Sequence, residues 1–427
     1  MNYTDRYLRE IANYSSLDVM LADVAIRIQL SPTDYQLAVD HYHAIHQWIE
    51  RDNSPLFRLV LDFYTQGGFS IGATVARHAT DDEFDIDVMA QLAYRTDVDP
   101  EFILSTLDDA IRAEPGSRYH DKADRKTRCS TVYYDGMHLD VTPTVRLEGT
   151  NEKTGLIFHS KPEDPREPKQ SLYANPHGFA QWFIQQTPPD QNFGTFFEKR
   201  SLDHDRARME LLQERADAKP VPEQAPAYRK SRAVIALQLI KRWRNLAYDK
   251  RHQSRRLPPS VLLAYFVAKH ANQTTTLSDE LTHQVDAMLA VLRAAQAEGR
   301  KVFAVNPTCP QDEFTDRWPA DLPDQRIFIN ELEIFAAKLE RLRGEMALSE
   351  TQKILEDLFG EKPAQSVIRE YVERLAKDVE GSGGRYLPGK AAIPAAVVGT
   401  QAAPSVVRAA PSHKFFGDHP DDLPKRR

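Results

Sequence analysis

The chain has 427 residues, of which 41% are apolar and 27% charged, an ordinary globular composition long enough for two packed lobes. Its formal net charge of −7 argues against constitutive nucleic-acid binding, which needs a basic face. The polar N-terminus and the absence of a long apolar run argue against a signal peptide and a membrane span, and predict a cytoplasmic protein. Cys129 and Cys309 lie in no CxxC or Cys/His cluster, which argues against a disulfide framework and a structural zinc site.

Capping residues and β-prone runs predict mixed α/β structure over the first 190 residues. Ser31 and Pro32 form a helix start, with a capping serine and a proline at the first helical position, and Asp99 starts another helix in the same way. Asp135-Gly136 between two β-prone runs predicts a hairpin. The predicted helices cover residues 16–29, 32–51 and 99–113, and the predicted strands cover 56–66, 84–92, 128–134 and 137–146.

The rest of the chain is predicted to be mostly helical. Residues 190–228 are charged and end in a Pro/Ala-rich stretch, which predicts a loop or an exposed insertion. Residues 381–427 are rich in Gly, Ala and Pro, which predicts a disordered tail. Helical periodicity covers residues 228–248, 258–272, 278–298, 328–346 and 350–378.

Three aspartates carry the main chemical signal. Side chains alternate along a strand, so Asp85 and Asp87 share one face, about 7 Å apart at Cα, and Asp140 lies on a face of the later hairpin. Three like charges on one polar face are costly unless a cation neutralises them. Two Mg²⁺ ions, which prefer such oxygen ligands, would do so, and would suit the displacement of pyrophosphate from a nucleoside triphosphate. The spacing therefore predicts a two-metal site for phosphoryl transfer.

A glycine turn precedes the first two acids. Gly67 and Gly68 follow a predicted strand and permit close backbone approach to phosphate oxygens. A helix over residues 71–78 would add its N-terminus to this anion site, and Ser70 and Thr74 can add hydroxyl donors. Either motif alone is weak, because Asp-x-Asp is usually a solvated strand face and Gly-Gly is usually a turn. Their combination in this order, with a third Asp in a separate hairpin, is much more specific.

The combination resembles the nucleotidyltransferase signature, and is similar in particular to the cGAS/DncV-like nucleotidyltransferases (CD-NTases) of bacterial anti-phage signalling, or CBASS. The stretches that carry this resemblance are QGGFSIGAT, STVYYDGMHLDVTPT, NPHGFAQWF and LQLIKRWRN. The resemblance implies an α+β, polymerase β-like fold in two lobes. Residues 1–190 would form a mixed-sheet palm with N-terminal helices, residues 191–380 a helical lobe that completes the nucleotide cleft, and residues 381–427 the tail.

The resemblance also implies roles for single residues. Asp85, Asp87 and Asp140 become the catalytic metal ligands for two Mg²⁺ ions, with Mn²⁺ as a substitute. Gly67 and Gly68 become part of the nucleotide site. The family turn carries Gly-Ser or Gly-Gly, so the serine hydroxyl is missing here and we expect Ser70 to replace it.

Two residues of the helical half are implied as nucleotide contacts by the resemblance alone. Lys241 would contact the triphosphate, and the alternative is a solvated helix position beside two arginines. Ser260 would be a further contact, and the alternative is a simple helix cap after two prolines. A lysine suits the first role as a movable point charge.

The function that this resemblance implies is the synthesis of a cyclic di- or trinucleotide second messenger from nucleoside triphosphates, with ATP expected as one substrate. The alternatives are a linear oligonucleotide synthase, an RNA or protein nucleotidyltransferase with the same core, and a catalytically silent nucleotide-binding scaffold. Phe415, Phe416 and Gly417 stand between charged residues of the predicted tail, which is typical of a docking motif for a protein partner, the alternative being an inert tail.

Overall fold

The computed structural model describes residues 14–76, 84–150, 153–161, 163–164, 166–213, 230–272 and 276–381. Residues up to Ile368 form one compact unit, and a second unit begins at Arg369. The predicted docking motif at Phe415, Phe416 and Gly417 lies outside the described residues.

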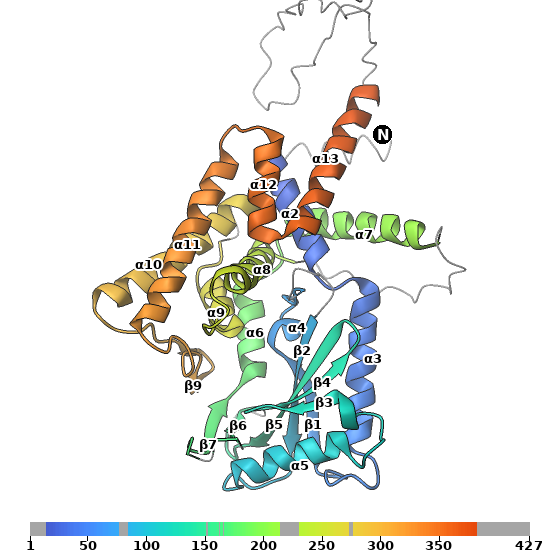
Figure 1. The fold of residues 1–427 in the computed structure, drawn as a ribbon, viewed down its shortest axis with the longest axis vertical. Coiled ribbons are helices and arrows are strands. Elements are labelled where there is room, and N and C mark those ends of the chain that lie inside the picture. The colour runs from blue at the N-terminus through green and yellow to red at the C-terminus, as the bar shows by residue number, and fades with distance from the viewer. Residues whose placement is uncertain are drawn as a thin grey trace, which may run out of the picture. The chain divides into compact units, whose positions relative to one another are not determined.

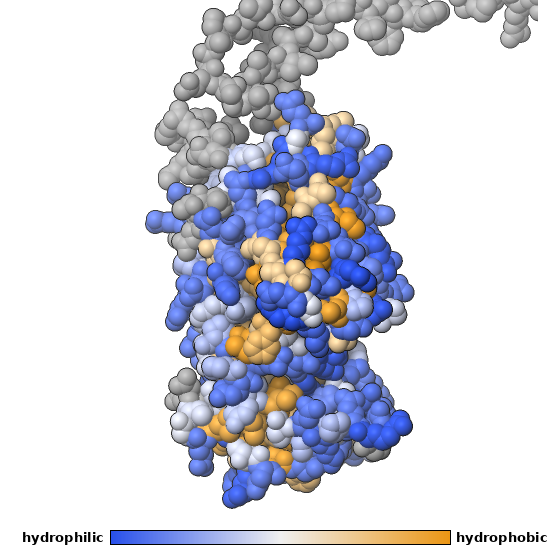
Figure 2. Space-filling model, turned by 90° about the vertical axis from the view of Figure 1, so that its left-hand side faces the viewer, coloured by the Kyte–Doolittle hydropathy of each residue, from blue (hydrophilic) through white to orange (hydrophobic). Residues whose placement is uncertain are grey.

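Within the described ranges, no helix combines the length and apolar character needed to cross a bilayer. In the face that Figure 2 shows, apolar side chains lie in separate patches among hydrophilic ones.

A seven-stranded mixed sheet organises the first half of the chain (Figure 1). Strands run in the order β1-β2-β5-β4-β3, and β6 pairs with β5 and β7. The pair β2/β5 is parallel, whereas the other pairs are antiparallel. The strands are β1 (Val60–Gln66), β2 (Phe84–Leu92), β3 (Ala123–Arg125), β4 (Ser130–Tyr134), β5 (Met137–Arg146), β6 (Gly155–His159) and β7 (Gln170–Ala174).

Two helices, α3 (Pro32–Ile49) and α5 (Pro100–Arg112), pack with the sheet into one hydrophobic core. Ile86, Val88 and Leu139 point into this core and are fully buried. Because side chains alternate along a strand, the intervening residues of β2 and β5 face the other way. That opposite face carries the three acids.

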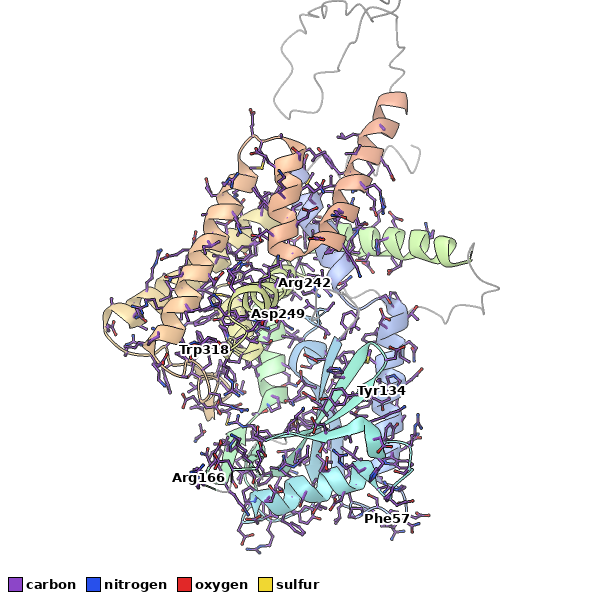
Figure 3. All side chains as sticks on the ribbon, viewed as in Figure 1. Phe57, Tyr134, Arg166, Arg242, Asp249 and Trp318 are labelled. Carbon is purple, nitrogen blue, oxygen red and sulfur yellow. The ribbon has the colours of Figure 1, made fainter. Side chains whose placement is uncertain are left out.

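The second half is helical and is organised around α8 (Arg232–Arg251), which is buried along most of its length. Figure 3 labels Arg242 and Trp318 within this half, and both side chains are fully buried. The other helices are α2 (Ser16–Ile28), α6 (Pro176–Gln186), α7 (Gln191–Gln213), α9 (Ser260–Lys269), α10 (Leu277–Ala297), α11 (Leu322–Arg343), α12 (Leu348–Phe359) and α13 (Glu361–Gly381). A short hairpin of β8 (Val305–Asn306) and β9 (Cys309–Glu313) joins α10 to α11, and a 3₁₀ turn, η1 (His120–Lys122), precedes β3.

The expected α+β class with a helical second part is confirmed, but three local predictions are wrong. The glycine turn itself forms a one-turn helix, α4 (Gly67–Ser70), and residues 71–76 are not helical because Gly72 takes a left-handed conformation at φ 66°. The charged stretch after residue 190 begins with α7, whose Phe193, Phe196 and Phe197 are buried at helical spacing. The predicted helix over 350–378 is two helices, divided at Gly360 with φ 102°.

Candidate active site

Two neighbouring parallel strands bring the three acids together. The register places Asp85 beside His138 and Asp87 beside Asp140. Thr131 of β4 lies on the other side of Asp140 and donates a hydrogen bond of 2.5 Å from its Oγ1 to Asp140 Oδ1. His138 Nδ1 lies 3.7 Å from Asp85 Oδ1. The parallel β2/β5 pairing therefore makes one acidic row from residues more than fifty positions apart.

The negative charge of the three carboxylates in this row exceeds the positive charge of the groups around them. Burial, together with the charges of Asp140 and Asp85, raises the pKa of Asp87 to about 7, whereas Lys241 opposes the shift. Among the described residues, no group of three His, Cys, Asp or Glu side chains is arranged to hold a metal ion as it stands. The donor chemistry nevertheless fits a hard cation, because the groups are carboxylates and an added positive charge would relieve their mutual repulsion.

The glycine turn packs directly against this row. A Cβ atom on Gly67 would lie 2.1 Å from Asp87 Oδ2, and the residue has φ 59°, so only glycine fits there. A Cβ on Gly68 would lie 2.9 Å from Lys241 Nζ. Ser70 donates its hydroxyl hydrogen to the carbonyl of Gly67 at 3.0 Å, so in this arrangement it stabilises the turn. The Thr74 hydroxyl is buried without a hydrogen-bond partner among the described residues.

Lys241 reaches the same place from α8. Its Nζ donates a hydrogen bond of 2.7 Å to the carbonyl oxygen of Ala73. Burial and the nearby Arg244 lower the pKa of Lys241 to about 8, while Asp87 and Asp85 raise it. Lys241, Arg242 and Arg244 are all buried, so the alternative of a solvated helix position is wrong.

Ser260 opens α9 and lies beside an arginine that the sequence did not single out. Both terminal nitrogens of Arg244 donate to Ser260 Oγ at 3.2 Å, and Nη1 also donates to the carbonyl of Pro258 at 2.6 Å. The N-cap of this helix is Pro259, so Ser260 is its first helical residue and not its cap. The Arg244 side chain therefore ties α8 to the start of α9.

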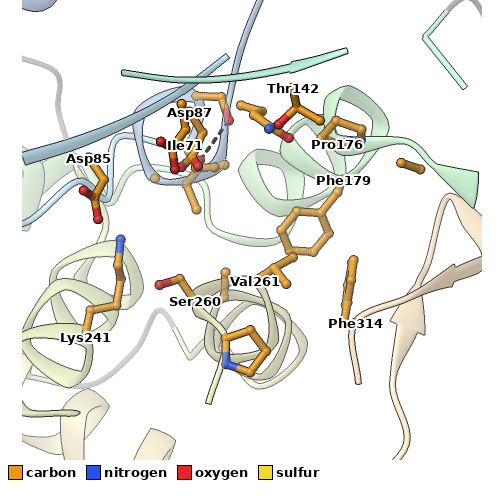
Figure 4. A pocket seen from close by; sticks show the side chains of 18 of the residues that line it. Ile71, Asp85, Asp87, Thr142, Pro176, Phe179, Lys241, Ser260, Val261 and Phe314 are labelled. Atoms are coloured by element: carbon orange, nitrogen blue, oxygen red, sulfur yellow. Dashed lines mark hydrogen bonds between the residues drawn. The ribbon is translucent and has the colours of Figure 1, made fainter. Parts of the chain in front are cut away.

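All nine residues proposed for the site from the sequence line a single cavity of about 620 Å³. Asp85 and Lys241 point toward one another across it, and Ser260 lies beside them (Figure 4). Phe179 and Phe314 form another part of the wall, with ring centroids 5.0 Å apart in an edge-to-face arrangement. The predicted residues in this cavity are Gly67, Gly68, Ser70, Thr74, Asp85, Asp87, Asp140, Lys241 and Ser260.

The cavity also contains residues that sequence reasoning missed. Arg128, Arg256 and Arg317 line it from three separate loops. Each lies outside a helix or strand, so neither periodicity nor spacing indicates its position. In the sequence, Arg244 is notable only because it lies close to Lys241. Phe314 is a single aromatic residue after a polar stretch.

The chain is similar in sequence and in structure to several known proteins. Residues 16–163 match the family model of the second messenger oligonucleotide or dinucleotide synthetase domain. A cyclic dinucleotide synthase, CdnG, of Bradyrhizobium diazoefficiens is 35% identical over 92% of this chain and 93% of the relative. A c-di-GMP synthase of Roseivirga ehrenbergii is 23% identical over 82% of this chain and 85% of the relative. The solved structure of the Bradyrhizobium CD-NTase CdnG in complex with GTP matches with a TM-score of 0.70 and 33% identity, over 83% of this chain and 98% of that one.

Proposed function

This chain belongs to the CD-NTase family and is a nucleotidyltransferase that makes a cyclic oligonucleotide, and we propose that it converts two GTP molecules into cyclic di-GMP. The observation that carries the proposal is the single cavity in which the acidic row, the glycine turn and Lys241 meet. The choice of guanine rests on the relatives, one of which is a c-di-GMP synthase and another of which was solved with GTP.

We assign the reacting centre to Asp85, Asp87 and Asp140. Their carboxylates would hold two Mg²⁺ ions, with Mn²⁺ as a substitute. Such ions, when bound, make the attacking hydroxyl more acidic and neutralise the departing pyrophosphate. Thr131 orients the Asp140 carboxylate through its hydrogen bond. His138 lies beside Asp85, with Nδ1 3.7 Å from Oδ1, which is beyond hydrogen-bond distance.

The surrounding groups bind and orient the triphosphate. The backbone N–H groups of Gly67 and Gly68 would donate to anionic oxygens of the triphosphate, and neither residue carries a side chain that would prevent close approach. The Lys241 ammonium, which lies next to Gly68, would supply a positive charge to the same oxygens. Arg244 holds Ser260 at the cavity wall, which leaves that hydroxyl's hydrogen free to be donated to a phosphate oxygen.

The reaction consists of two transfers of the same kind. A ribose hydroxyl oxygen of one GTP forms a bond to the α-phosphorus of the other, the bond from that phosphorus to the bridging oxygen breaks, and pyrophosphate leaves while the hydroxyl proton passes to solvent. The linear dinucleotide then turns so that its own α-phosphate meets the remaining ribose hydroxyl. The second transfer closes the ring and releases a second pyrophosphate.

Product analysis with the purified full chain tests this proposal. The chain is incubated with each nucleoside triphosphate alone and with all four together, in Mg²⁺ or Mn²⁺, and the products are treated with phosphatase and identified by mass spectrometry. GTP alone should give a phosphatase-resistant product with the mass of cyclic di-GMP. A requirement for ATP would replace the proposed substrate pair, a phosphatase-sensitive product would indicate a linear synthase, and the absence of product would favour a silent scaffold.

We further propose that this activity serves anti-phage defence in the cytoplasm. The support is the membership of the family. Expression of the chain together with the genes that flank its own gene, followed by phage challenge, tests this role. The chain should lower plaque formation, and the Asp85→Asn/Asp87→Asn variant should not. Equal protection by this inactive variant would contradict a role that depends on the product.

A further inference from the structure

Three arginines gather at one end of the catalytic cavity. Arg128 precedes β4, Arg256 lies between α8 and α9, and Arg317 follows β9. None of them belongs to the acidic row, the glycine turn or the Lys241 group described above. The inference drawn from them rests on the proposed function, because it concerns the second nucleotide in the same cavity.

Among the residues that the structure describes, two of these guanidinium groups have no carboxylate partner. Arg128 forms an ion pair with Asp316. Arg256 donates only to the carbonyl oxygen of Arg317, at 3.4 Å, and Arg317 donates only to Thr127 Oγ1, at 3.5 Å. Within the described ranges, neither has an ion-pair partner. Burial lowers the pKa of Arg317, as do the charges of Arg128 and Arg256, whereas Asp316 and Glu167 raise it. Asp316 is paired with Arg128, and Glu167 is paired with His159 and Lys161, so the cluster keeps a surplus of positive charge.

The other acids near this end have partners of their own. Asp312 accepts hydrogen bonds from the backbone N–H of Asn175 at 3.1 Å and from Asn306 Nδ2 at 2.9 Å. Glu313 accepts a hydrogen bond of 2.9 Å from the hydroxyl of Thr315. Neither forms an ion pair with the arginines, so the surplus charge is available to an anionic ligand.

The arginine end lies beyond the acids along the sheet. The cavity lining extends from Asp85, which is level with His138 of β5, to Ile157, which pairs with Thr144. Six residues of strand correspond to about 20 Å. Arg128 precedes the point at which β4 pairs with Val141, so it lies toward the Thr144 end. The acids and the glycine turn thus leave room on this side for a second nucleotide.

We propose that Arg128, Arg256 and Arg317 bind the 5′-triphosphate of the GTP that supplies the attacking hydroxyl. That hydroxyl must lie at the acidic row, and the 5′-phosphates leave the same ribose on its far side. They are therefore directed away from the acids and toward the arginine end. Guanidinium groups are suited to phosphate because their planar N–H donors bind two oxygens at once.

The test separates the two nucleotides by chemistry. α-Labelled 2′,3′-dideoxy-GTP serves as the nucleotide that is attacked, because it has no ribose hydroxyl and cannot attack. The attacking nucleotide is either GMP or a GTP analogue with a methylene bridge between its α- and β-phosphates, which cannot be cleaved. Each transfer then gives one labelled linear product and one pyrophosphate. The measured quantity is the ratio of the KM for GMP to the KM for the triphosphate analogue.

In the unaltered chain this ratio should exceed one, because only the analogue carries the β- and γ-phosphates. Arg256→Met combined with Arg317→Met should lower it by about tenfold or more. Arg256→Met alone should lower it partly, and since Arg256 is exposed its truncation does not disturb the core. Arg317→Lys should retain part of the preference. Arg300→Met, at an exposed arginine paired with Glu298, is the matched control and should leave the ratio unchanged.

An unchanged ratio in the double variant would overturn the proposal. A change in the preference for guanine over adenine, measured with the corresponding adenine nucleotides and without loss of the phosphate dependence, would also overturn it, since the arginines would then read the base. A failure of the proposed function is distinguishable from a failure of this inference. In the first case the unaltered chain makes no cyclic di-GMP from GTP, whereas in the second it does so and only the arginine variants give the unexpected result.

Discussion

Gly67 lies so close to Asp87 that a Cβ atom at position 67 would come within 2.1 Å of Asp87 Oδ2. The glycine turn that we propose binds phosphate and the central acid of the row therefore share one surface. A triphosphate held by the turn is consequently also held against the carboxylates. The turn and the acids therefore form one structural unit.

Gly67→Ala should reduce kcat/KM for product formation by roughly a hundredfold or more, because the methyl group must displace Asp87 from its position. Steady-state kinetics with GTP measures the change. Gly72→Ala is the matched control, since Gly72 also has a positive φ but a Cβ there would meet only Lys230 Cε at 4.0 Å. Equal losses in the two variants would attribute the effect to backbone strain and contradict the proposed contact.

Lys241→Met should lower kcat/KM by about 10- to 100-fold through the loss of a buried charge beside the triphosphate. Lys250→Met, on the same helix but with its side chain 48% exposed, is the control and should have no effect. Kinetics with GTP and a melting curve for each variant separate catalysis from folding. A Lys241→Met chain that retains full kcat/KM would remove Lys241 from the nucleotide site.

Stabilisation by Mg²⁺ should increase as pH rises through about 7. In the metal-free protein the folded-state pKa of Asp87 is raised above its ordinary value, so its favourable contribution is present at low pH and is lost as pH rises through about 7. Metal binding requires the ionised carboxylate, and an added cation relieves the repulsion that then appears. The rise in Tm caused by Mg²⁺ should thus be larger well above pH 7 than well below it.

Asp87→Asn is the control for this pH dependence. Its amide does not ionise, so the part of the Mg²⁺ effect that varies through pH 7 should disappear. If the Mg²⁺-induced shift in Tm is the same at both pH values, or keeps its pH dependence in Asp87→Asn, Asp87 is not the group that couples metal binding to protons.

Thr131→Val should raise the Mg²⁺ concentration needed for half-maximal activity about tenfold, because Asp140 loses the hydrogen bond that orients it. Thr131→Ser keeps the hydroxyl and should retain the normal requirement. A Mn²⁺ titration monitored by electron paramagnetic resonance compares the metal affinity of the two variants directly, in the absence of turnover. Equal metal affinity in the Val and Ser variants would show that this hydrogen bond has no part in holding the metal.

Much of the site could be predicted because its signals are local. The period of two along a strand placed Asp85 and Asp87 on one face, and Asp135-Gly136 marked the hairpin that carries Asp140. The parallel pairing of β2 with β5 has no such local signal, since it joins strands separated by a helix and a hairpin. The proximity of Asp87 to Asp140 therefore remained an expectation until the structure was available.

The helical half was less predictable for physical reasons. Helix α8 is buried on nearly all sides, so it has no polar face that would reveal the direction of Lys241. The helix α7 was missed because its charged residues outweighed the regular spacing of Phe193, Phe196 and Phe197. Long-range packing, rather than local pattern, decides both features.

The central claim is that Asp85, Asp87 and Asp140 hold the metals that bind the GTP triphosphate against the glycine turn. The most direct test is a crystal structure of the full chain with Mn²⁺ and a non-hydrolysable GTP analogue, in which anomalous scattering locates the ions. Two manganese peaks should lie in contact with the three carboxylates, with the triphosphate beside Gly68 and Lys241. Manganese or triphosphate bound elsewhere, with the acidic row unoccupied, would contradict this account.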